Sequence, residues 1–168
     1  KLENCRLKIG YPDNHWVDYT NFVMGDSYAT NIITCLAEYF KYEMSFIDMN
    51  IKPDLWYEIL PSTANMYYVY NQNEIVVPAA MLQLPMFYAN GDDAINYGAI
   101  GASIAHELTH GFDYQGQMFD EFGNLNDWWT DSDKLEFNRR AQNLIDRYNS
   151  FIVIDTMHAD GELTFNEN

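Results

Sequence analysis

The stretch "IGASIAHELTHGFD", residues 100–113, contains two of the four histidines in the chain, His106 and His110, with Glu107 directly after the first. The surrounding segment, 94–112, is rich in Gly, Ala and Ile and has no basic residue, which predicts a buried helix. On a helix, residues i and i+4 lie on one face. Two imidazoles placed in this way can bind one tetrahedral zinc ion at roughly 2.0–2.1 Å.

Glu107 has a position that suits a base better than a ligand. It follows the first histidine of the pair, so its carboxylate points beside the ion and not at it. There it can hold a zinc-activated water and accept its proton, which is the chemistry of amide hydrolysis. The alternative is a pair of hydrogen-bonded core histidines. Ionisable groups buried in an apolar helix need a partner or a metal, and this favours the zinc hypothesis.

The third protein ligand is not evident from the motif. The other histidines, His15 and His158, have no motif around them, and positions 113 and 116 are Asp and Gly, so the pattern HExxHxxGxxH is not completed. A glutamate from a separate helix is the other common solution.

Apolar periodicity and turn residues predict the other elements. Asp26 or Ser27 is a plausible N-cap for the first predicted helix, and Thr130 with Asp133 forms a capping-box pattern at the start of the last one. The expected segments are a loop over 8–20, a helix over 26–47, a β-hairpin of strands 66–70 and 74–77, and a helix over 130–151.

Length and charge limit the classes of function. A chain of 168 residues suits a single domain. Its formal net charge of −16 repels nucleic acid and anionic membrane surfaces, and favours cationic or neutral partners or divalent metal, although it also serves solubility. Cys5 and Cys35 form no metal motif, and could pair only if the fold brings them together.

Three segments together resemble the neprilysin/endothelin-converting-enzyme family of zinc metallopeptidases (M13), and most of all the bacterial PepO-type oligopeptidases. They are "NMYYVYNQNEIVVPAAMLQLPMF", "NYGAIGASIAHELTHGFDYQGQMFDEFGNLNDWW" and "HADGELTFNEN". The resemblance implies an α+β, zincin-like (thermolysin-like) catalytic core, in which the HExxH helix lies beside a small strand-rich lobe. It covers nearly the whole chain.

The resemblance also implies residue roles. His106, His110 and Glu167 would bind one Zn²⁺ ion, since "NEN" at 166–168 falls where the family carries "GEN". Glu107 would be the general base and then the proton shuttle. Asn65 matches the asparagine of the family's "NAYY" segment, which hydrogen-bonds the substrate backbone, and Met66, which replaces the alanine, would lie near the cleaved bond. From the residues alone, a turn or cap residue is the preferred interpretation of Asn65.

Some family features are altered or absent. Tyr114 replaces Asp in the family's "GFDDQG", and Asn166 replaces the glycine before the third ligand. The family's next aspartate would fall at position 171, and its oxyanion-stabilising histidine, its substrate-binding arginine and its helical N-terminal domain also lie outside the chain. We therefore expect 1–168 to be one partial catalytic domain, truncated after the third zinc ligand and, when isolated, weakly active or inactive.

The leading functional hypothesis is a zinc metalloendopeptidase that hydrolyses peptide bonds of oligopeptides through a zinc-activated water. The alternative is a catalytically silent zinc- or peptide-binding relative. A structural zinc domain would need a closed four-ligand site, commonly rich in cysteine, which two cysteines thirty residues apart do not supply. The expected partners are peptides and the remainder of the same protein, with no nucleic acid. The resemblance favours the cell envelope of a bacterium or an extracellular location, with the cytoplasm as the alternative.

Overall fold

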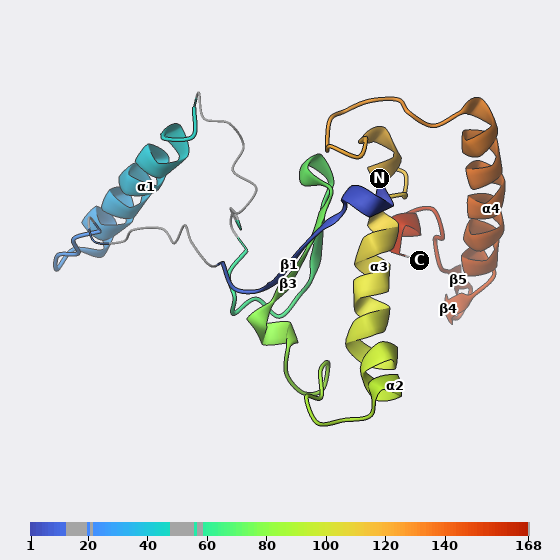
Figure 1. Cartoon of the computed structure of the whole chain (residues 1–168), viewed down its shortest axis with the longest axis horizontal. Helices are drawn as coiled ribbons and strands as arrows, with labels where there is room; N and C mark the ends of the chain where they lie inside the picture. Colours follow the sequence, from blue (N-terminus) through green and yellow to red (C-terminus); the bar gives the residue numbers. More distant parts are fainter. Residues whose placement is uncertain (13–19, 21, 48–55, 57–58, 168) are drawn as a thin grey trace. The chain divides into compact units, whose positions relative to one another are not determined.

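The computed structural model describes residues 1–12, 20, 22–47, 56, 59–60 and 61–167. These residues form two compact units. One consists of Lys1–Gly10 and Pro61–Asn168, and the other of Tyr11–Leu60. The first unit contains the HExxH segment, and Figure 1 shows its sheet beside a long helical segment. The mixture of helices and strands confirms the predicted α+β class. The expectation that one domain spans the whole chain stays a prediction.

A three-stranded sheet forms the core of the first unit, with strands β1 (Arg6–Gly10), β2 (Tyr67–Val69) and β3 (Glu74–Pro78). β3 is central, antiparallel to β2 and parallel to β1. The predicted hairpin is therefore confirmed. The loop predicted over 8–20 is wrong at residues 8–10, because this short segment gains its strand conformation from pairing with β3, far along the chain. Residues 13–19 lie outside the described residues.

β3 is buried along its whole length, which explains its run of β-branched residues. Glu74 at its start is fully buried and would be costly there without compensation. Lys8 Nζ lies 2.6 Å from its Oε1 and Arg6 Nη2 lies 3.0 Å from its Oε2. These two cations on β1 hold the central strand in register with its parallel neighbour.

The turn between β2 and β3 contains the 3₁₀ helix η2 (Tyr70–Gln72) and ends at Asn73, whose φ of 50° is left-handed. Asparagine tolerates this conformation better than most residues. The buried Asn73 side chain accepts a hydrogen bond from the Tyr68 hydroxyl at 2.6 Å through Oδ1, and its Nδ2 donates to the carbonyls of Lys1 and Glu121. The hairpin turn is thus tied to the N-terminus and to a distant loop.

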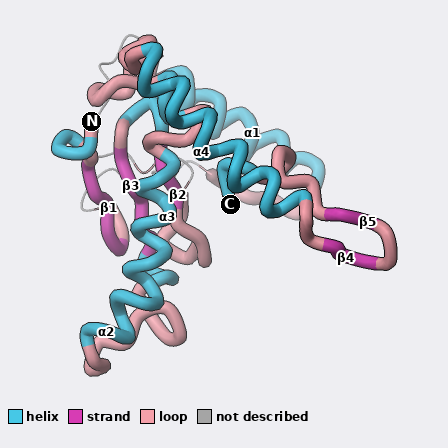
Figure 2. The backbone as a smooth tube through the Cα atoms, turned by 90° about the vertical axis from the view of Figure 1, so that its right-hand side faces the viewer, coloured by secondary structure: helices cyan, strands magenta, loops and turns pink. Residues whose placement is uncertain are grey.

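The HExxH segment lies in a continuous helical stretch made of α2 (Asp93–Asn96), the π-helical turn η4 (Tyr97–Gly101) and α3 (Ala102–His110). Figure 2 shows α3 running alongside β2 and β3. The prediction of a helix over 94–112 is confirmed, but the prediction that it is buried is wrong. The small sheet covers only one side of this helical stretch. Its buried residues are therefore few, namely Ile100, Glu107 and His110.

The C-terminal part of this unit contains α4 (Asp131–Asn149), β4 (Ile152–Ile154) and β5 (Met157–His158), followed by the 3₁₀ turn η6 (Phe165–Glu167). The capping box of Thr130 and Asp133 is confirmed. The remaining 3₁₀ turns of the unit are η1 (Leu2–Asn4), η3 (Ala79–Met81) and η5 (Gly116–Met118). Figure 1 shows the C-terminal turn beside α3, which brings Glu167 to the HExxH segment.

The second unit contains α1 (Tyr28–Met44), which confirms the helix expected over 26–47. Ser27 is its N-cap, and its side chain accepts a hydrogen bond from the Thr30 amide. Cys35 lies in this helix and is a free thiol, as is Cys5 in the first unit. Among the described residues, none of the helices combines the length and apolar character that a membrane crossing requires.

Candidate metal centre

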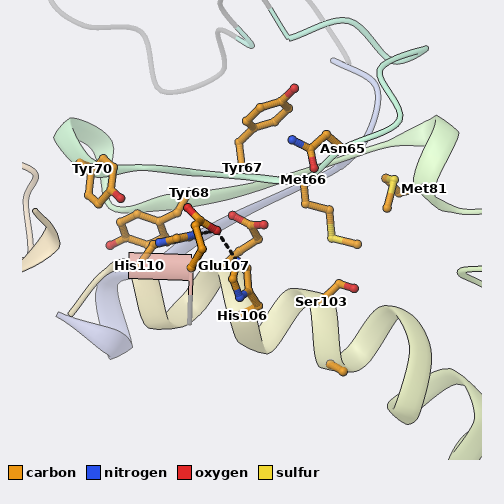
Figure 3. Close-up of a pocket in the computed structure, with 12 residues that line it drawn as sticks. Asn65, Met66, Tyr67, Tyr68, Tyr70, Met81, Ser103, His106, Glu107 and His110 are labelled. Carbon is orange, nitrogen blue, oxygen red and sulfur yellow. Dashed lines mark hydrogen bonds and ion pairs between the residues drawn. The ribbon is translucent and has the colours of Figure 1, made fainter. Parts of the chain in front are cut away.

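One face of α3 presents His106, Glu107 and His110 together. An imidazole nitrogen or carboxylate oxygen of each lies within 4.8 Å of those of the other two. The two imidazole rings meet edge to face, with centroids 4.8 Å apart. Figure 3 shows all three side chains reaching from the helix toward the strand that carries Tyr67 and Tyr68. The helical spacing predicted from the sequence is therefore realised.

Glu167 joins this group from the other end of the unit. Its Oε2 lies 3.2 Å from Nε2 of His106 and 3.7 Å from Nε2 of His110. Three ligands of a tetrahedral zinc ion, with bonds of about 2.0–2.2 Å, are separated from one another by roughly 3.3–3.6 Å. The separations of Oε2 of Glu167 from the two Nε2 atoms, 3.2 and 3.7 Å, are close to this range, as a shared zinc ion requires. Their chemistry, two imidazoles and one carboxylate, also fits zinc.

The exposure of these three groups differs. The His110 side chain is only 10% exposed, whereas those of His106 and Glu167 are 41% and 63% exposed. A metal held by them would be reached from the side of His106 and Glu167. Such an open position distinguishes catalytic zinc sites from closed structural ones.

Asp113 orients His110 and was not identified from the sequence. Its buried Oδ2 lies 2.9 Å from Nδ1 of His110, so the ring directs Nε2 toward Glu167. Metal-binding histidines commonly donate their second ring N–H to a carboxylate in this way. The available signal was an acid three residues after the second histidine. The Asp113 carboxylate also accepts hydrogen bonds from the amides of Gln115 and Gly116, and from the Tyr70 hydroxyl at 3.1 Å.

The turn after α3 packs tightly onto the end of the helix. A Cβ atom at Gly116 would lie 1.9 Å from the His110 carbonyl oxygen, so only glycine fits there. Lys1 Nζ donates to the carbonyls of Gly116 and Phe119 at 2.6 and 2.7 Å. These contacts fix the position of Asp113, and through it the orientation of the His110 ring.

Glu107 is buried beside the two histidines. The backbone N–H of Tyr68, on β2, donates a hydrogen bond to its carboxylate. Burial raises the pKa of Glu107 above its ordinary value, and the nearby negative charge of Glu167 acts in the same direction, against the opposing effects of both histidines. A carboxylate with a raised pKa accepts a proton more readily, which suits a general base.

The two histidines, Glu107 and Glu167 line a pocket of about 560 Å³ between α3 and β2. β2 is an edge strand of the sheet, so its outer side has no strand partner among the described residues. Asn65 is exposed and lines the pocket just before β2. Met66 also lines it, but its side chain is 3% exposed and belongs to the hydrophobic core. Figure 3 shows Met66 pointing toward Ser103 on the helix side.

His158 does not join the group. His158 donates from Nδ1 to the Asn149 carbonyl at the end of α4, 2.9 Å away. His15 lies outside the described residues.

A family model described as Peptidase family M13 matches residues 65–168, which is more than half of the chain and includes the HExxH segment and Glu167. The chain belongs to peptidase family M13. The predicted resemblance is therefore confirmed, and with it the zincin-like fold.

Named M13 relatives agree with this assignment. The chain is 42% identical over 180 residues to neprilysin-1 of Caenorhabditis elegans, and covers 23% of that protein. It is 36% identical over 143 residues to an endothelin-converting enzyme homologue of Locusta migratoria, aligning 85% of this chain with 19% of that protein. The M13 chain thus spans about a quarter or less of the length of these relatives.

Solved structures give the same result. The inhibitor complex of the Mycobacterium tuberculosis zinc metalloprotease Zmp1 superposes with a TM-score of 0.89 at 39% identity, covering 98% of this chain and 26% of that one. PepO from Lactobacillus rhamnosis superposes with a TM-score of 0.87 at 28% identity and the same coverage. Both proteins share the M13 fold over almost the whole of this chain.

Proposed function

We propose that the protein containing this chain is a zinc metalloendopeptidase that hydrolyses peptide bonds of oligopeptides. The observation that carries the proposal is the approach of Oε2 of Glu167 to Nε2 of His106 and to Nε2 of His110, at 3.2 and 3.7 Å, which is close to the spacing of ligands on one zinc ion. Membership of a family of zinc peptidases supports it.

His106, His110 and Glu167 would hold the ion, and Asp113 would keep the His110 ring in the tautomer that presents Nε2. When bound, zinc supplies a Lewis acid that polarises a carbonyl and lowers the pKa of water to about 7. The fit rests on the donor set and on the 3.2 and 3.7 Å separations between the ligand atoms.

Glu107 would carry the proton through the reaction. Its carboxylate accepts a proton from the attacking water molecule and then donates it to the nitrogen of the departing amine. The Tyr68 amide holds this carboxylate in place, and burial raises the pKa of Glu107, which makes its carboxylate a better proton acceptor for the first transfer. The carboxylate is anionic before the reaction and after it, which leaves the base regenerated.

The peptide would lie along the open edge of β2. An extended peptide adds to a sheet edge through main-chain hydrogen bonds. Because the Tyr68 amide is engaged by Glu107, the pairing would fall on the side of Asn65 and Met66. The exposed Asn65 amide could then bind the peptide backbone directly. The net charge of −16 would favour neutral or cationic peptides, as a long-range effect.

Replacing the base tests the proposal. In the full-length protein, Glu107→Gln should lower kcat for peptide hydrolysis by about 10²–10⁴-fold while one zinc ion per chain stays bound. Glu162→Gln, at an exposed position in a loop, is the matched control and should hydrolyse the peptide at the wild-type rate. Hydrolysis that persists in Glu107→Gln would contradict the mechanism. A wild-type protein that binds zinc and peptide without turnover would instead be a catalytically silent relative.

A further inference from the structure

The turn that carries Glu167 is too short to hold itself in place. η6 is a three-residue 3₁₀ turn, and its local hydrogen bonds join the Phe165 amide to the Glu162 carbonyl and the Glu167 amide to the Thr164 carbonyl. A single turn of this kind is marginal without tertiary contacts. The Glu167 side chain is 63% exposed, so it is not fixed by burial. Its position must come from neighbouring side chains.

Three aromatic rings supply such contacts. The centroid of the Phe165 ring lies 4.9 Å from that of Tyr114 and 6.1 Å from that of Phe137. The centroids of the Tyr114 and Phe137 rings are 5.3 Å apart. Two of the pairs are edge to face and the third is tilted, which are favourable arrangements. Each ring contacts the other two, and we call this group, Tyr114, Phe137 and Phe165, the aromatic anchor.

The members of the aromatic anchor come from three separate segments. Phe137 lies on α4, Phe165 begins η6, and Tyr114 follows the end of α3. Tyr114 comes directly after Asp113, whose carboxylate orients His110. One turn of the chain thus sets the orientation of His110 through Asp113 and the position of η6 through Tyr114. The packing of Gly116 against the His110 carbonyl keeps this turn rigid.

We infer that the aromatic anchor is a positioning device, which sets the Glu167 carboxylate against His106 and His110 and so completes the metal centre. This inference rests on the proposed function, because it assigns a purpose to rings that touch neither the metal nor the substrate. Tyr114 stands where the resembled family carries aspartate, so this ring contact is not a property of the family's motif. The anchor accounts for how a ligand 57 residues after His110 is held without being buried.

Zinc affinity of the full-length protein, measured by competition with a chelator, tests the inference. Phe165→Ala and Tyr114→Ala should each weaken zinc binding about 10–100-fold, the usual cost of losing a group that supports a metal ligand. Tyr114→Phe keeps the ring and should bind zinc as tightly as the wild type. Tyr148→Ala is the matched control, because it removes a comparable ring pair, that with Phe151 at a centroid distance of 5.6 Å, which includes none of the anchor rings. It should leave zinc affinity unchanged.

A double variant distinguishes a role in positioning Glu167 from a general loss of structure. In Glu167→Gln, where the ligand itself is impaired, adding Phe165→Ala should weaken zinc binding no further. If Phe165→Ala does not fold, Phe165→Leu and Tyr114→Ala take its place in the same comparison. Additive losses in the double variant, or wild-type affinity in Tyr114→Ala and Phe165→Ala, would overturn the inference.

The two proposals fail differently. If Glu167→Gln binds zinc as tightly as the wild type, the ligand assignment is wrong, and the aromatic anchor falls with it. If Glu167→Gln weakens binding but the ring variants do not, the ligand assignment stands and the anchor alone is wrong.

Discussion

Nε2 of His106 lies 3.2 Å from Oε2 of Glu167, although 61 residues separate them in the sequence. His110 lies on the same side, with its Nε2 3.7 Å from the same oxygen. A carboxylate shared between two imidazoles, beside a buried glutamate, is an arrangement that zinc would complete.

Asp113 should control zinc affinity without binding zinc. Asp113→Asn removes the charge that holds Nδ1 of His110 and keeps the shape of the side chain. We expect zinc to bind about 10–100-fold more weakly, as measured by chelator competition. Asp146→Asn, an exposed position on α4, is the control and should have no effect. Unchanged affinity in Asp113→Asn would show that the His110 ring is oriented by other contacts.

Glu107 should make the metal-free protein less stable as the pH rises. Its pKa is raised in the folded state by burial, so between about pH 4.5 and that raised pKa the folded state binds more protons than the unfolded state. The free energy of unfolding therefore falls as the pH rises through this window. Glu107→Gln resembles the neutral acid and should remove this loss, which makes it more stable than the wild type at pH 7.

Urea unfolding from pH 4 to 7 with excess chelator measures this effect. Glu162→Gln, at an exposed position, should follow the wild-type pH dependence. A Glu107→Gln variant that loses stability with pH as steeply as the wild type would show that Glu107 does not carry the effect.

Glu74 should be essential for the sheet. Glu74→Gln removes the negative charge that lies 2.6 Å from Nζ of Lys8, whose side chain is 10% exposed. Breaking a buried ion pair from one side costs about 3–5 kcal/mol of unfolding free energy. Asp127→Asn breaks a pair with Lys134 that is more exposed, where about 0.2–1 kcal/mol is expected. Urea denaturation of both variants measures the difference, and equal losses would refute the structural role of Glu74.

Asn65 should affect the substrate and not the metal. Asn65→Ala removes a neutral hydrogen bond to the peptide backbone, so kcat/KM should fall about 3–10-fold while zinc affinity is unchanged. Asn90→Ala, another exposed asparagine, should retain wild-type kinetics. If kcat/KM is unchanged in Asn65→Ala, the peptide does not contact this side chain, and Asn65 serves as a turn residue.

The parts of the site that the sequence predicts are those joined by local geometry. His106, Glu107 and His110 lie within one helical turn or so, and the period of a helix suffices to bring them together. Glu167 has no local pattern, and only the family resemblance indicated it. Asp113 escaped notice because its role depends on the turn that brings its carboxylate under the His110 ring.

The fold shows the same division. The hairpin of β2 and β3 follows from aromatic and β-branched runs around an asparagine-rich turn, and it lies where these runs predict it. The sequence does not predict β1, because Arg6–Gly10 becomes a strand through parallel pairing with residues 74–78. Long-range pairing of this kind leaves no periodic signal in the short segment itself. The apolar composition of residues 94–112 overstates the burial of this helix for a related reason. Composition does not show how large a sheet is available to cover a helix.

The most direct test of the central claim is the structure of the zinc-loaded full-length protein around the metal, by crystallography or X-ray absorption. The account predicts one zinc ion within about 2.0–2.2 Å of Nε2 of His106, Nε2 of His110 and a carboxylate oxygen of Glu167, with Glu107 outside that distance. A zinc ion bound by Glu107 in place of Glu167, or bound away from these histidines, would contradict it.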